Sequence, residues 1–212
     1  LSASVGAGSA NFPQDEDGII RRAPTAIYFE GPDRVYPSLI MTATIDILGI
    51  KKDGGFDYDF DNNILRLIDT TDTVVREIPI DDNGRMYVNY YGKFQTFYYL
   101  PYMYCFDPEM LPPEYWEGKV ALVGASLPGL MDLRNTPVQE TFAGVEIHAN
   151  VMNSLLKNEF VEPKDRADTF IVIIAICILL GIIVSFPEKP LYTLPIPIVG
   201  IVAWVLFTYS QF

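Results

Sequence analysis

Few of the residues that usually carry chemistry occur in this sequence. His148 is the one histidine, and the two cysteines, Cys105 and Cys177, lie far apart along the chain. A single histidine does not complete a set of nucleophile, base and orienting carboxylate, because no nucleophile is evident. Glu146 lies two residues from His148, and this spacing does not bring both side chains to one helix face as metal ligands. We therefore predict no catalytic residue, no metal site and no cofactor.

A turn with glycine and proline follows an apolar run at residues 119–125. Gly124 and Ser126 lie at the end of this run, and Asp132 lies a few residues further on. Ligands of α/β folds often bind at the carboxyl ends of buried strands. The turn lacks the Lys and Ser/Thr of a phosphate-binding loop, so the sequence does not support nucleotide binding. We interpret it as a structural turn, and the alternative is a small-molecule pocket with Asp132 at its mouth.

Two acidic segments have structural interpretations. Asp17 lies in a turn and is close enough in sequence to Arg21 or Arg22 to form an ion pair. Aspartates alternate at residues 57–63 as in a calcium loop, but Asn62 replaces the glycine of such a loop. Ile68 stands where the bidentate glutamate belongs. This segment is therefore interpreted as an acidic strand face or loop.

Charge divides the chain into two regions. The net charge is −12, and after Phe170 only Glu188 and Lys189 are charged. Because phosphate binding needs a basic patch, nucleic acid is excluded as a partner. The acidic region, residues 1–168, is long enough to bury a core and is predicted to form one domain.

The uncharged region is predicted to form a transmembrane helical hairpin. Residues 170–186 carry no charge. As a helix they would cover roughly 26 Å of a hydrocarbon core about 30 Å thick. We predict a transmembrane helix at 169–187, a cytoplasmic turn at 188–190 and a second transmembrane helix at 191–212, with membrane lipid as a partner. A buried helix of a soluble protein is the alternative for the first span, and charge alone does not determine the orientation.

The acidic region mixes strand and helix patterns. Residues 26–29 predict a strand, and Pro37 and Ser38 open a helix that Gly49 ends. Asn83-Gly84 between two β-rich runs predicts a hairpin in an antiparallel middle part.

The second half of the acidic region supplies the rest of the predicted sheet. The apolar run 119–125 predicts a central strand buried on both faces, and residues 98–116 predict a packed, irregular connection. Residues 144–157 predict a helix with Glu146 and Asn150 on its polar side, and His148 is interpreted as a hydrogen-bonded packing residue. The predicted fold class is α/β (mixed α+β): a mixed sheet with flanking helices and an antiparallel hairpin, followed by the transmembrane hairpin.

Six segments in order resemble the second class of CHASE domains, which are extracytoplasmic sensory domains of bacterial signalling proteins. The segments are DEDGIIRRAP (15–24), YPSLIMTA (36–43), DDNGRMYVNYYG (81–92), GKVALVGASLPGLMD (118–132), TP (136–137) and GVEIHANVMNSLL (144–156). Asp17, Arg21, Asp132 and His148 fall on recurring positions of these segments.

The resemblance implies a bacterial cytoplasmic-membrane protein with its soluble domain in the periplasm or outside the cell. It also implies further chain: an N-terminal half of the domain before residue 1, and a third span followed by a nucleotide cyclase, diguanylate cyclase or kinase. We therefore expect the sensory input region of a receptor, acting as a homodimer on an unknown extracytoplasmic ligand or protein.

Two other hypotheses remain open from the sequence. The domain could be a dimerising and anchoring module without a sensing role, with the tyrosine-rich residues 87–104 as its protein interface. A hydrolase using Asp132 and His148 ranks last.

Overall fold

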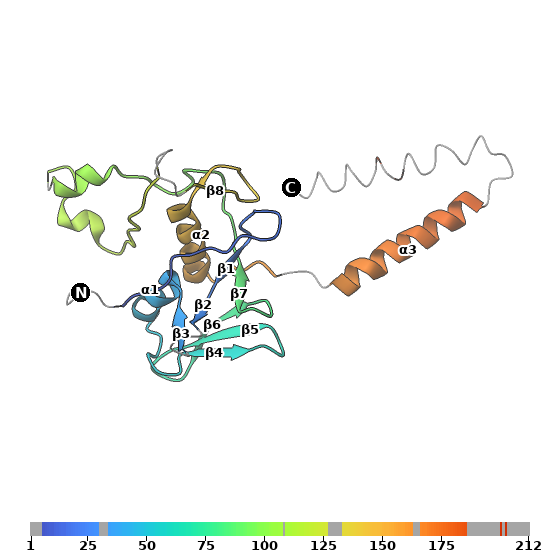
Figure 1. Ribbon diagram of the computed structural model, residues 1–212, viewed down its shortest axis with the longest axis horizontal. Coiled ribbons are helices and arrows are strands. Elements are labelled where there is room, and N and C mark those ends of the chain that lie inside the picture. The colour runs from blue at the N-terminus through green and yellow to red at the C-terminus, as the bar shows by residue number, and fades with distance from the viewer. Residues whose placement is uncertain are drawn as a thin grey trace. The chain divides into compact units, whose positions relative to one another are not determined.

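The computed structural model describes residues 6–29, 34–107, 109–126, 133–162, 166–185, 200 and 202. The chain divides into two compact units, Leu1–Glu162 and Pro163–Phe212. Figure 1 shows helices α1 and α2 with the strands of the first unit, and helix α3 of the second. Three predictions lie outside the described residues: the place of Asp132, the turn at 188–190 and nearly all of the span at 191–212.

The strands of the first unit form small antiparallel sheets, which confirms the prediction of antiparallel structure in its middle part. One sheet has the strand order β4-β5-β6, and the other described strands pair as β1 with β7, β2 with β3, and β8 with β9. The strands are β1 (Arg22–Pro24), β2 (Ala26–Phe29), β3 (Arg34–Pro37), β4 (Phe56–Asp59), β5 (Ile64–Ile68), β6 (Val74–Pro79), β7 (Arg85–Tyr87), β8 (Leu133–Arg134) and β9 (Phe142–Ala143). The acidic residues 57–63 form strand β4 and the turn after it, as predicted.

The turn at Asn83-Gly84 does not close the predicted hairpin. The Gly84 amide donates to the carbonyl of Asp81 at 2.8 Å, and a φ of +69° explains the glycine. However, β6 pairs with β5, while β7 pairs with β1 and sets Ala23 opposite Met86. The prediction was wrong because the turn fixes only a local reversal, whereas strand pairing here follows the burial of Ala23 and Met86 in the core.

Both predicted helices of this unit form. Helix α1 spans Leu39–Ile47 and begins after Ser38, whose side chain accepts a hydrogen bond from the Met41 amide. Helix α2 spans Gly144–Lys157 and ends at Asn158, which adopts the left-handed conformation at a φ of 58°. Asparagine tolerates this conformation better than most residues, so it ends the helix where glycine is often found.

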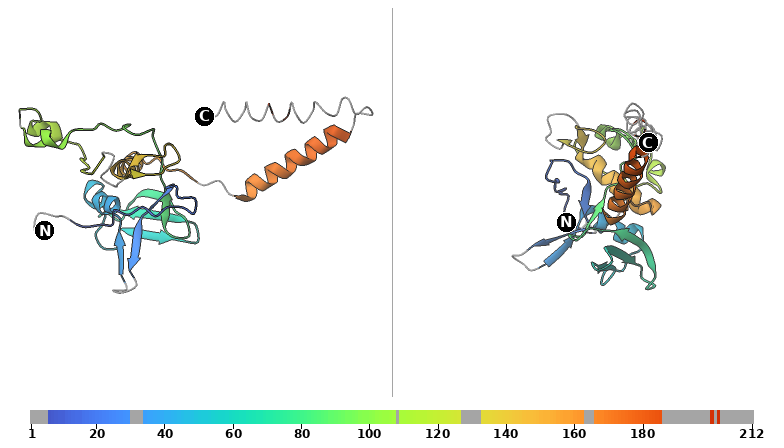
Figure 2. Two further views of the ribbon diagram at one scale, coloured as in Figure 1. Left: turned by 45° about the horizontal axis from the view of Figure 1, so that its top comes forward. Right: turned by 90° about the vertical axis from the view of Figure 1, so that its right-hand side faces the viewer.

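One hydrophobic core joins these elements. Its fully buried members come from α1, β5, β6, β9 and α2 as well as from the chain before β1, and Figure 2 shows these elements from two further sides. They include Ile20, Ile40, Met41, Leu65, Leu67, Ile78, Phe142, Ile147 and Leu155. Burying a Leu, Ile or Phe side chain contributes about 1.5–3 kcal/mol, so this cluster holds the small sheets and the two helices together.

The predicted central strand at 119–125 is absent. These residues are neither strand nor helix, and Val120 and Val123 are 44% and 76% exposed. Every sheet among the described residues is antiparallel, so the predicted mixed sheet is also wrong; the parallel contact is an isolated bridge between Ser9 and Ser38. The physical reason is that an apolar run becomes a strand only when another strand lies beside it, and no described strand does.

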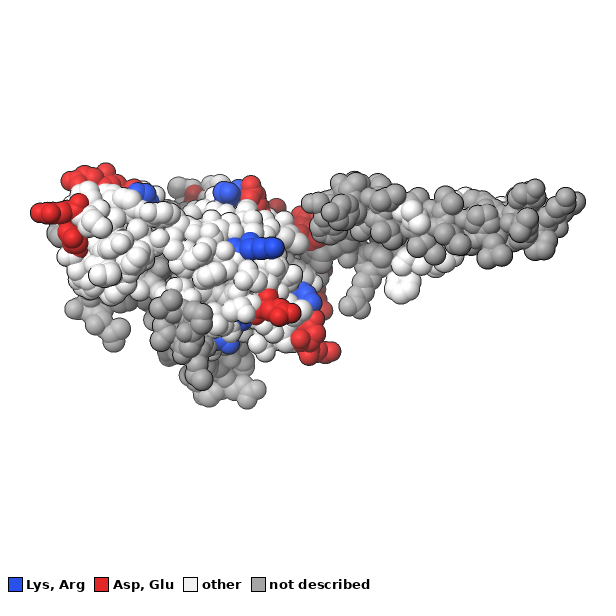
Figure 3. All heavy atoms as spheres, turned by 90° about the horizontal axis from the view of Figure 1, so that it is seen from above, with Lys and Arg blue, Asp and Glu red and all other residues white. Residues whose placement is uncertain are grey.

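Residues 100–107 and 109–118, here called the lobe, form the irregular connection predicted from their prolines. The lobe contains two short 3₁₀ helices, η1 (Tyr102–Phe106) and η2 (Pro113–Trp116), and neither has a buried residue. Figure 1 shows them away from the strands. The prediction that this connection is packed was wrong, because Met103 and Phe106 are 71% and 73% exposed. Acidic side chains gather at this end of the unit (Figure 3); Asp107, Glu109, Glu114 and Glu117 are exposed.

The second unit contains helix α3, Arg166–Ser185. It covers most of the first predicted span, and its apolar side chains from Phe170 to Ile174 are each more than half exposed. Among the described residues, none of the helices meets the length and hydropathy that a membrane-crossing helix requires.

Candidate functional site

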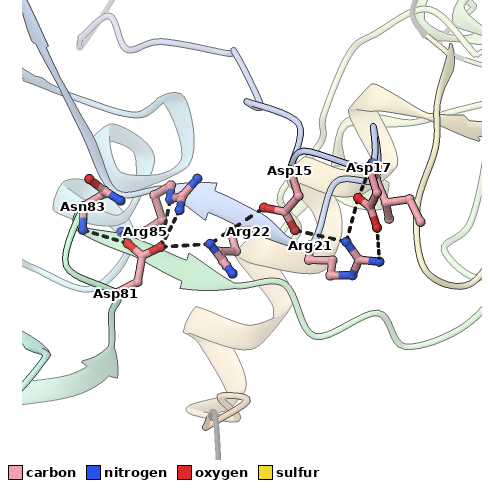
Figure 4. Close-up of polar contacts among 8 residues, drawn as sticks. Asp15, Asp17, Arg21, Arg22, Asp81, Asn83 and Arg85 are labelled. Carbon is pink, nitrogen blue, oxygen red and sulfur yellow. Dashed lines mark hydrogen bonds and ion pairs between the residues drawn. The ribbon is translucent and has the colours of Figure 1, made fainter. Parts of the chain in front are cut away.

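Asp17 and Arg21 belong to a chain of alternating charges, here called the ladder (Figure 4). The guanidinium of Arg21 donates to both carboxylate oxygens of Asp17, at 2.9 and 2.7 Å, and to Asp15 at 3.2 Å. The other carboxylate oxygen of Asp15 lies 3.8 Å from a nitrogen of Arg22. The ladder therefore begins in the loop before β1 and passes along that strand.

Asp81 lies at the other end of the ladder, between Arg22 and Arg85. Its carboxylate lies 3.4 Å from Arg22 and accepts a hydrogen bond from Nε of Arg85 at 2.8 Å. It also accepts the backbone amides of Asn83 and Arg85, at 3.0 and 2.9 Å. The side chain of Asp81 thus fixes the turn at Asn83-Gly84 and joins it to β1. The pairing of β1 with β7 was not predicted from the sequence.

The protonation of the ladder follows from these contacts. The hydrogen bonds from Arg21 hold the pKa of Asp17 below its ordinary value, and the same contacts raise the pKa of Arg21. Burial alone would raise the pKa of Asp81, but the hydrogen bonds from the side chain and amide of Arg85 lower it overall. All three groups are therefore charged at neutral pH.

The ladder balances its own charges, with Asp15, Asp17 and Asp81 against Arg21, Arg22 and Arg85. An anion could bind Arg21 only by displacing Asp17, which already occupies its guanidinium in a bidentate pair. The sequence prediction that Asp17 pairs with Arg21 or Arg22 is confirmed, and the partner is Arg21. Their geometry favours a structural role within the loop before β1, and Asp15 and Arg22 join that loop to Asp81.

Two of the other predicted site residues, Gly124 and His148, lie along helix α2. The ring of His148 is 4.4 Å from the ring of Phe12, so this histidine packs against an aromatic side chain. Gly124 lies against the same helix, because a Cβ added there would come within 2.6 Å of the Cβ of Val145. Ser126 is partly buried. The structure thus places Gly124 and His148 along α2, and the ladder residues in a separate network.

A segment missed by sequence reasoning lies along α2. We call it the strap, residues 89–99. The carboxylate of Glu146, 2% exposed, accepts the backbone amides of Gln95 and Thr96 at 3.0 and 2.9 Å, and the hydroxyl of Tyr99 at 3.0 Å. Gln95 has a φ of +68°, a left-handed conformation of the kind that turns successive amides toward one anion. The buried carboxylate is therefore satisfied almost entirely by the strap.

The strap also contacts the later turns of α2. The side-chain oxygen of Asn150, 1% exposed, accepts the amide of Tyr91 at 3.0 Å. The ring of Tyr91 lies 4.9 Å from the ammonium of Lys157, and its hydroxyl donates to Glu159 at 2.9 Å. The strap therefore runs beside α2 from its first turn to just past its end.

This contact corrects the predicted orientation of α2. The sequence assigned Glu146 and Asn150 to the polar side of the helix, where solvent is the usual neighbour, yet both are buried. Their burial depends on hydrogen bonds from a segment about fifty residues earlier, and helical periodicity carries no information about such a partner. The one local signal was a pair of polar residues at i and i+4, a spacing that places them side by side.

The carboxyl end of α2 is fixed by a residue of the β4-β5-β6 sheet. Arg76 of β6 donates from Nε to the carbonyl of Leu155 at 2.7 Å and from its terminal nitrogen to the carbonyl of Leu156 at 3.2 Å. These are carbonyls of the last turn, where a positive charge also interacts favourably with the helix dipole. Helix α2 is therefore held by the strap along its side and by the sheet at its carboxyl end.

The described residues contain no cluster of histidine, cysteine, aspartate or glutamate side chains suited to hold a metal ion. Burial raises the pKa of Tyr99, and its hydrogen bond to Glu146 raises it further, so this tyrosine remains a neutral donor. Both carboxylate oxygens of Glu146 already accept hydrogen bonds from the strap. The contact between the strap and α2 is therefore a structural link between two segments.

The comparisons with known proteins give one positive result. A family model described as the CHASE2 domain matches residues 2–184, which is most of the chain. Neither the curated proteins nor the solved structures include a match.

Proposed function

The chain belongs to the CHASE2 domain family of extracytoplasmic sensory domains, and from that premise we propose that it is the sensory input region of a bacterial transmembrane receptor. In this proposal residues 1–168 lie in the periplasm or outside the cell, and the apolar residues after them anchor the protein in the cytoplasmic membrane. The output is a nucleotide cyclase, diguanylate cyclase or kinase joined after the anchor.

The contact between the strap and α2 carries this proposal. A sensor needs an element that responds to the outside and that continues toward the membrane. Helix α2 is bound along its length by the strap, and the strap leads directly into the exposed lobe. Beyond α2 the chain reaches α3 at Arg166. A stimulus that changes the strap therefore changes the contacts of the helix that precedes the anchor.

The composition and exposure of α3 support the membrane anchor. Its side chains from Phe170 to Ile174 are apolar and each more than half exposed, an arrangement that is costly in water. At roughly −0.3 to −0.6 kcal/mol for each Leu, Ile, Phe or Val near the bilayer centre, insertion of such a helix is favoured by several kcal/mol. The orientation, with the soluble domain outside, rests on membership of an extracytoplasmic family.

Signalling by this route requires two states of the domain. A ligand or protein partner shifts the balance between them only if it binds one state more tightly than the other. We propose that the two states differ in how the strap lies on α2, because the Glu146 contacts depend on the conformation of the strap backbone at Gln95.

Labelling of Cys105 tests the location. This cysteine lies exposed in the lobe, and the other cysteine, Cys177, can be replaced by serine. We expect a membrane-impermeant maleimide to label Cys105 in spheroplasts that express the receptor, before the cytoplasmic membrane is broken. A Cys105→Ser variant controls for background. Labelling that begins only after lysis of that membrane would overturn the proposed location.

A second candidate function is a dimerising anchor without a sensing role. The exposed aromatic and methionine side chains of the lobe favour it, since Tyr102, Met103, Phe106 and Met110 are each more than half exposed. Exposed apolar patches of this kind mark protein contact sites. The two candidates differ in one measurable property: only a sensor has strap and α2 amides whose hydrogen exchange changes with the stimulus.

A further inference from the structure

The lobe, residues 100–107 and 109–118, exposes large apolar side chains. Neither of its two 3₁₀ helices has a buried residue. Four of its aromatic and methionine side chains are each more than half exposed: Tyr102, Met103, Phe106 and Met110. Side chains of these types are enriched in protein interfaces, and a group of them in water is costly. The lobe therefore has the composition of a contact surface.

The lobe also carries acids that have no cationic partner. Between residues 94 and 118 the sequence contains four acidic residues and no lysine or arginine. Figure 3 shows acidic side chains gathered at this end of the unit. In the described part of the chain, none of the four forms an ion pair, and all are exposed: Asp107, Glu109, Glu114 and Glu117. The acids of the ladder, by contrast, are all paired with arginines.

The free acids alternate with the exposed apolar side chains. Asp107 directly follows Phe106 and ends η1, and Glu109 directly precedes Met110. Neither 3₁₀ helix has a basic residue in its last turn that would neutralise these acids. A partner that covers the apolar side chains must therefore also face uncompensated negative charge.

One ammonium group already lies on this surface and shows how a cation is held there. Nζ of Lys119 lies 3.7 Å from the centroid of the Tyr115 ring and donates to the carbonyl of Tyr115. The face of an aromatic ring attracts a cation because it is electron-rich. Tyr102 and Phe106 form another aromatic pair, with ring centroids 5.2 Å apart, and no described cation lies over either ring. This pair is open to a cation from outside the chain.

Charge and apolar area together decide among the possible partners. A second copy would bring the four acids of one lobe against the same four acids of the other. Nucleic acid and anionic lipid would be repelled for the same reason. A small polyamine would pair with the acids but would leave the apolar side chains in water. A peptide that carries lysine or arginine beside apolar side chains matches both properties of the lobe.

We propose that the lobe binds a cationic amphipathic peptide segment of an extracytoplasmic partner. Its apolar side chains cover Met103 and Phe106, and its cationic groups lie against the free acids and the open aromatic pair. The lobe directly follows Tyr99, whose hydroxyl donates to Glu146 of α2, so binding acts on the segment that leads into the strap. The proposal deepens the sensory function by naming the class of stimulus, and it rests on that function for the claim that binding is a signal.

Three fluorescent probe peptides of about four helical turns test the chemistry of the partner. One carries lysine and leucine on opposite faces, one replaces its leucines by serine, and one replaces its lysines by glutamate. The full chain is held in phosphatidylcholine nanodiscs, and binding to empty nanodiscs is subtracted. We expect fluorescence anisotropy to give the lysine–leucine peptide a dissociation constant about tenfold or more below those of the other two. Equal binding of the lysine–serine or the glutamate–leucine peptide would overturn the proposal.

Paired charge substitutions locate the binding. Glu114→Gln with Glu117→Gln removes two free charges from the lobe. Glu16→Gln with Glu140→Gln is the matched control, because it removes two exposed charges elsewhere and gives the same net charge. We expect the dissociation constant of the lysine–leucine peptide to rise about fivefold in the lobe variant and less than about twofold in the control. Equal effects of the two variants would show that the lobe is not the site.

An apolar substitution tests the other half of the contact. Phe106→Ser should weaken binding of the lysine–leucine peptide severalfold, and the variant should keep its fold because η1 has no buried residue. Val35→Ser, at a 63% exposed valine of β3, should bind like the native chain. A dimer that forms more tightly when Glu114 and Glu117 are neutralised would overturn the proposal, since a second copy would then cover the lobe. Cys105 labelling is measured separately, so the sensory proposal would survive that result.

Discussion

At the scale of single residues, the carboxylate of Glu146 accepts hydrogen bonds from backbone amides in place of water. A buried carboxylate is costly unless it is hydrogen-bonded, and here two strap amides and one tyrosine hydroxyl supply its donors at about 3 Å. The nearest neighbours of the carboxylate in sequence, on α2 itself, contribute none of these. The attachment of the strap therefore depends on this one side chain more than on any other contact.

Replacing Glu146 by glutamine should loosen the strap. The amide side chain keeps the size of the carboxylate but loses its charge and presents an amide group to strap donors, so we expect the free energy of unfolding to fall by about 1.5–3 kcal/mol. Urea unfolding of the full chain in mild detergent measures this, and hydrogen exchange at Gln95 and Thr96 should quicken. Glu140→Gln, an exposed control, should change neither quantity; equal behaviour of the two variants would contradict the role of Glu146.

Asp81 makes stability depend on pH in one direction. Its pKa in the folded state is lower than the ordinary value of 3.8, so its contribution is complete well above that pH and is lost as the pH falls through the lowered value. We expect the native chain to be more stable than Asp81→Asn by about 1 kcal/mol at neutral pH. The difference should shrink below about pH 4 in urea unfolding series. A difference that stays constant down to about pH 2 would show that the charge of Asp81 contributes nothing.

At the scale of elements, the carboxyl end of α2 is held by the side chain of Arg76 on strand β6. Replacing Arg76 by methionine keeps the packing of its stem and removes two hydrogen bonds to the carbonyls of Leu155 and Leu156. We expect a loss of about 1–2 kcal/mol and faster hydrogen exchange in the last turn of α2. Arg76→Lys should fall between the two, since it keeps the charge but not the paired donors. No change in the last turn would mean that Arg76 does not cap the helix.

The elements divide into those that local sequence predicts and those that it does not. Helix α1 was predicted from apolar spacing, the serine at its start and Gly49 after its end, and α2 from the spacing of its polar and apolar residues; all of these are local signals. The pairing of β7 with β1 was missed because it joins residues more than sixty positions apart. The prediction of a central strand at 119–125 was wrong because apolar composition indicates that a segment can be buried but does not indicate which strand lies beside it.

The candidate site divides in the same way. The ion pair of Asp17 with Arg21 was predicted because the two residues are close in sequence. The roles of Glu146, Asn150 and Arg76 were missed, since each contacts a segment about fifty to eighty positions away. His148 was interpreted from its apolar helical neighbours as a hydrogen-bonded packing residue, and its ring packs against that of Phe12.

At the scale of the whole molecule, the proposed anchor has a direct test. Ile174 lies in α3 and is 55% exposed, so a lysine there fits a water-exposed helix well and a membrane helix badly. A lysine at the centre of a span costs about 2.5–3.5 kcal/mol of insertion. We expect Ile174→Lys to increase severalfold the fraction of protein that carbonate extracts from membranes. Ile47→Lys, at a 42% exposed site of α1, should not; equal extraction of the two variants would argue against the anchor.

The way Glu146 holds the strap has a consequence for how this protein can diverge between species. The carboxylate contacts main-chain amides of Gln95 and Thr96, which every amino acid except proline provides. The side chains at those two positions are exposed and do not contact the carboxylate, so substitutions that keep the left-handed backbone at Gln95 leave the attachment in place. The surface next to the lobe can thus acquire new stimuli through substitution, and the linkage to α2 does not have to be rebuilt each time.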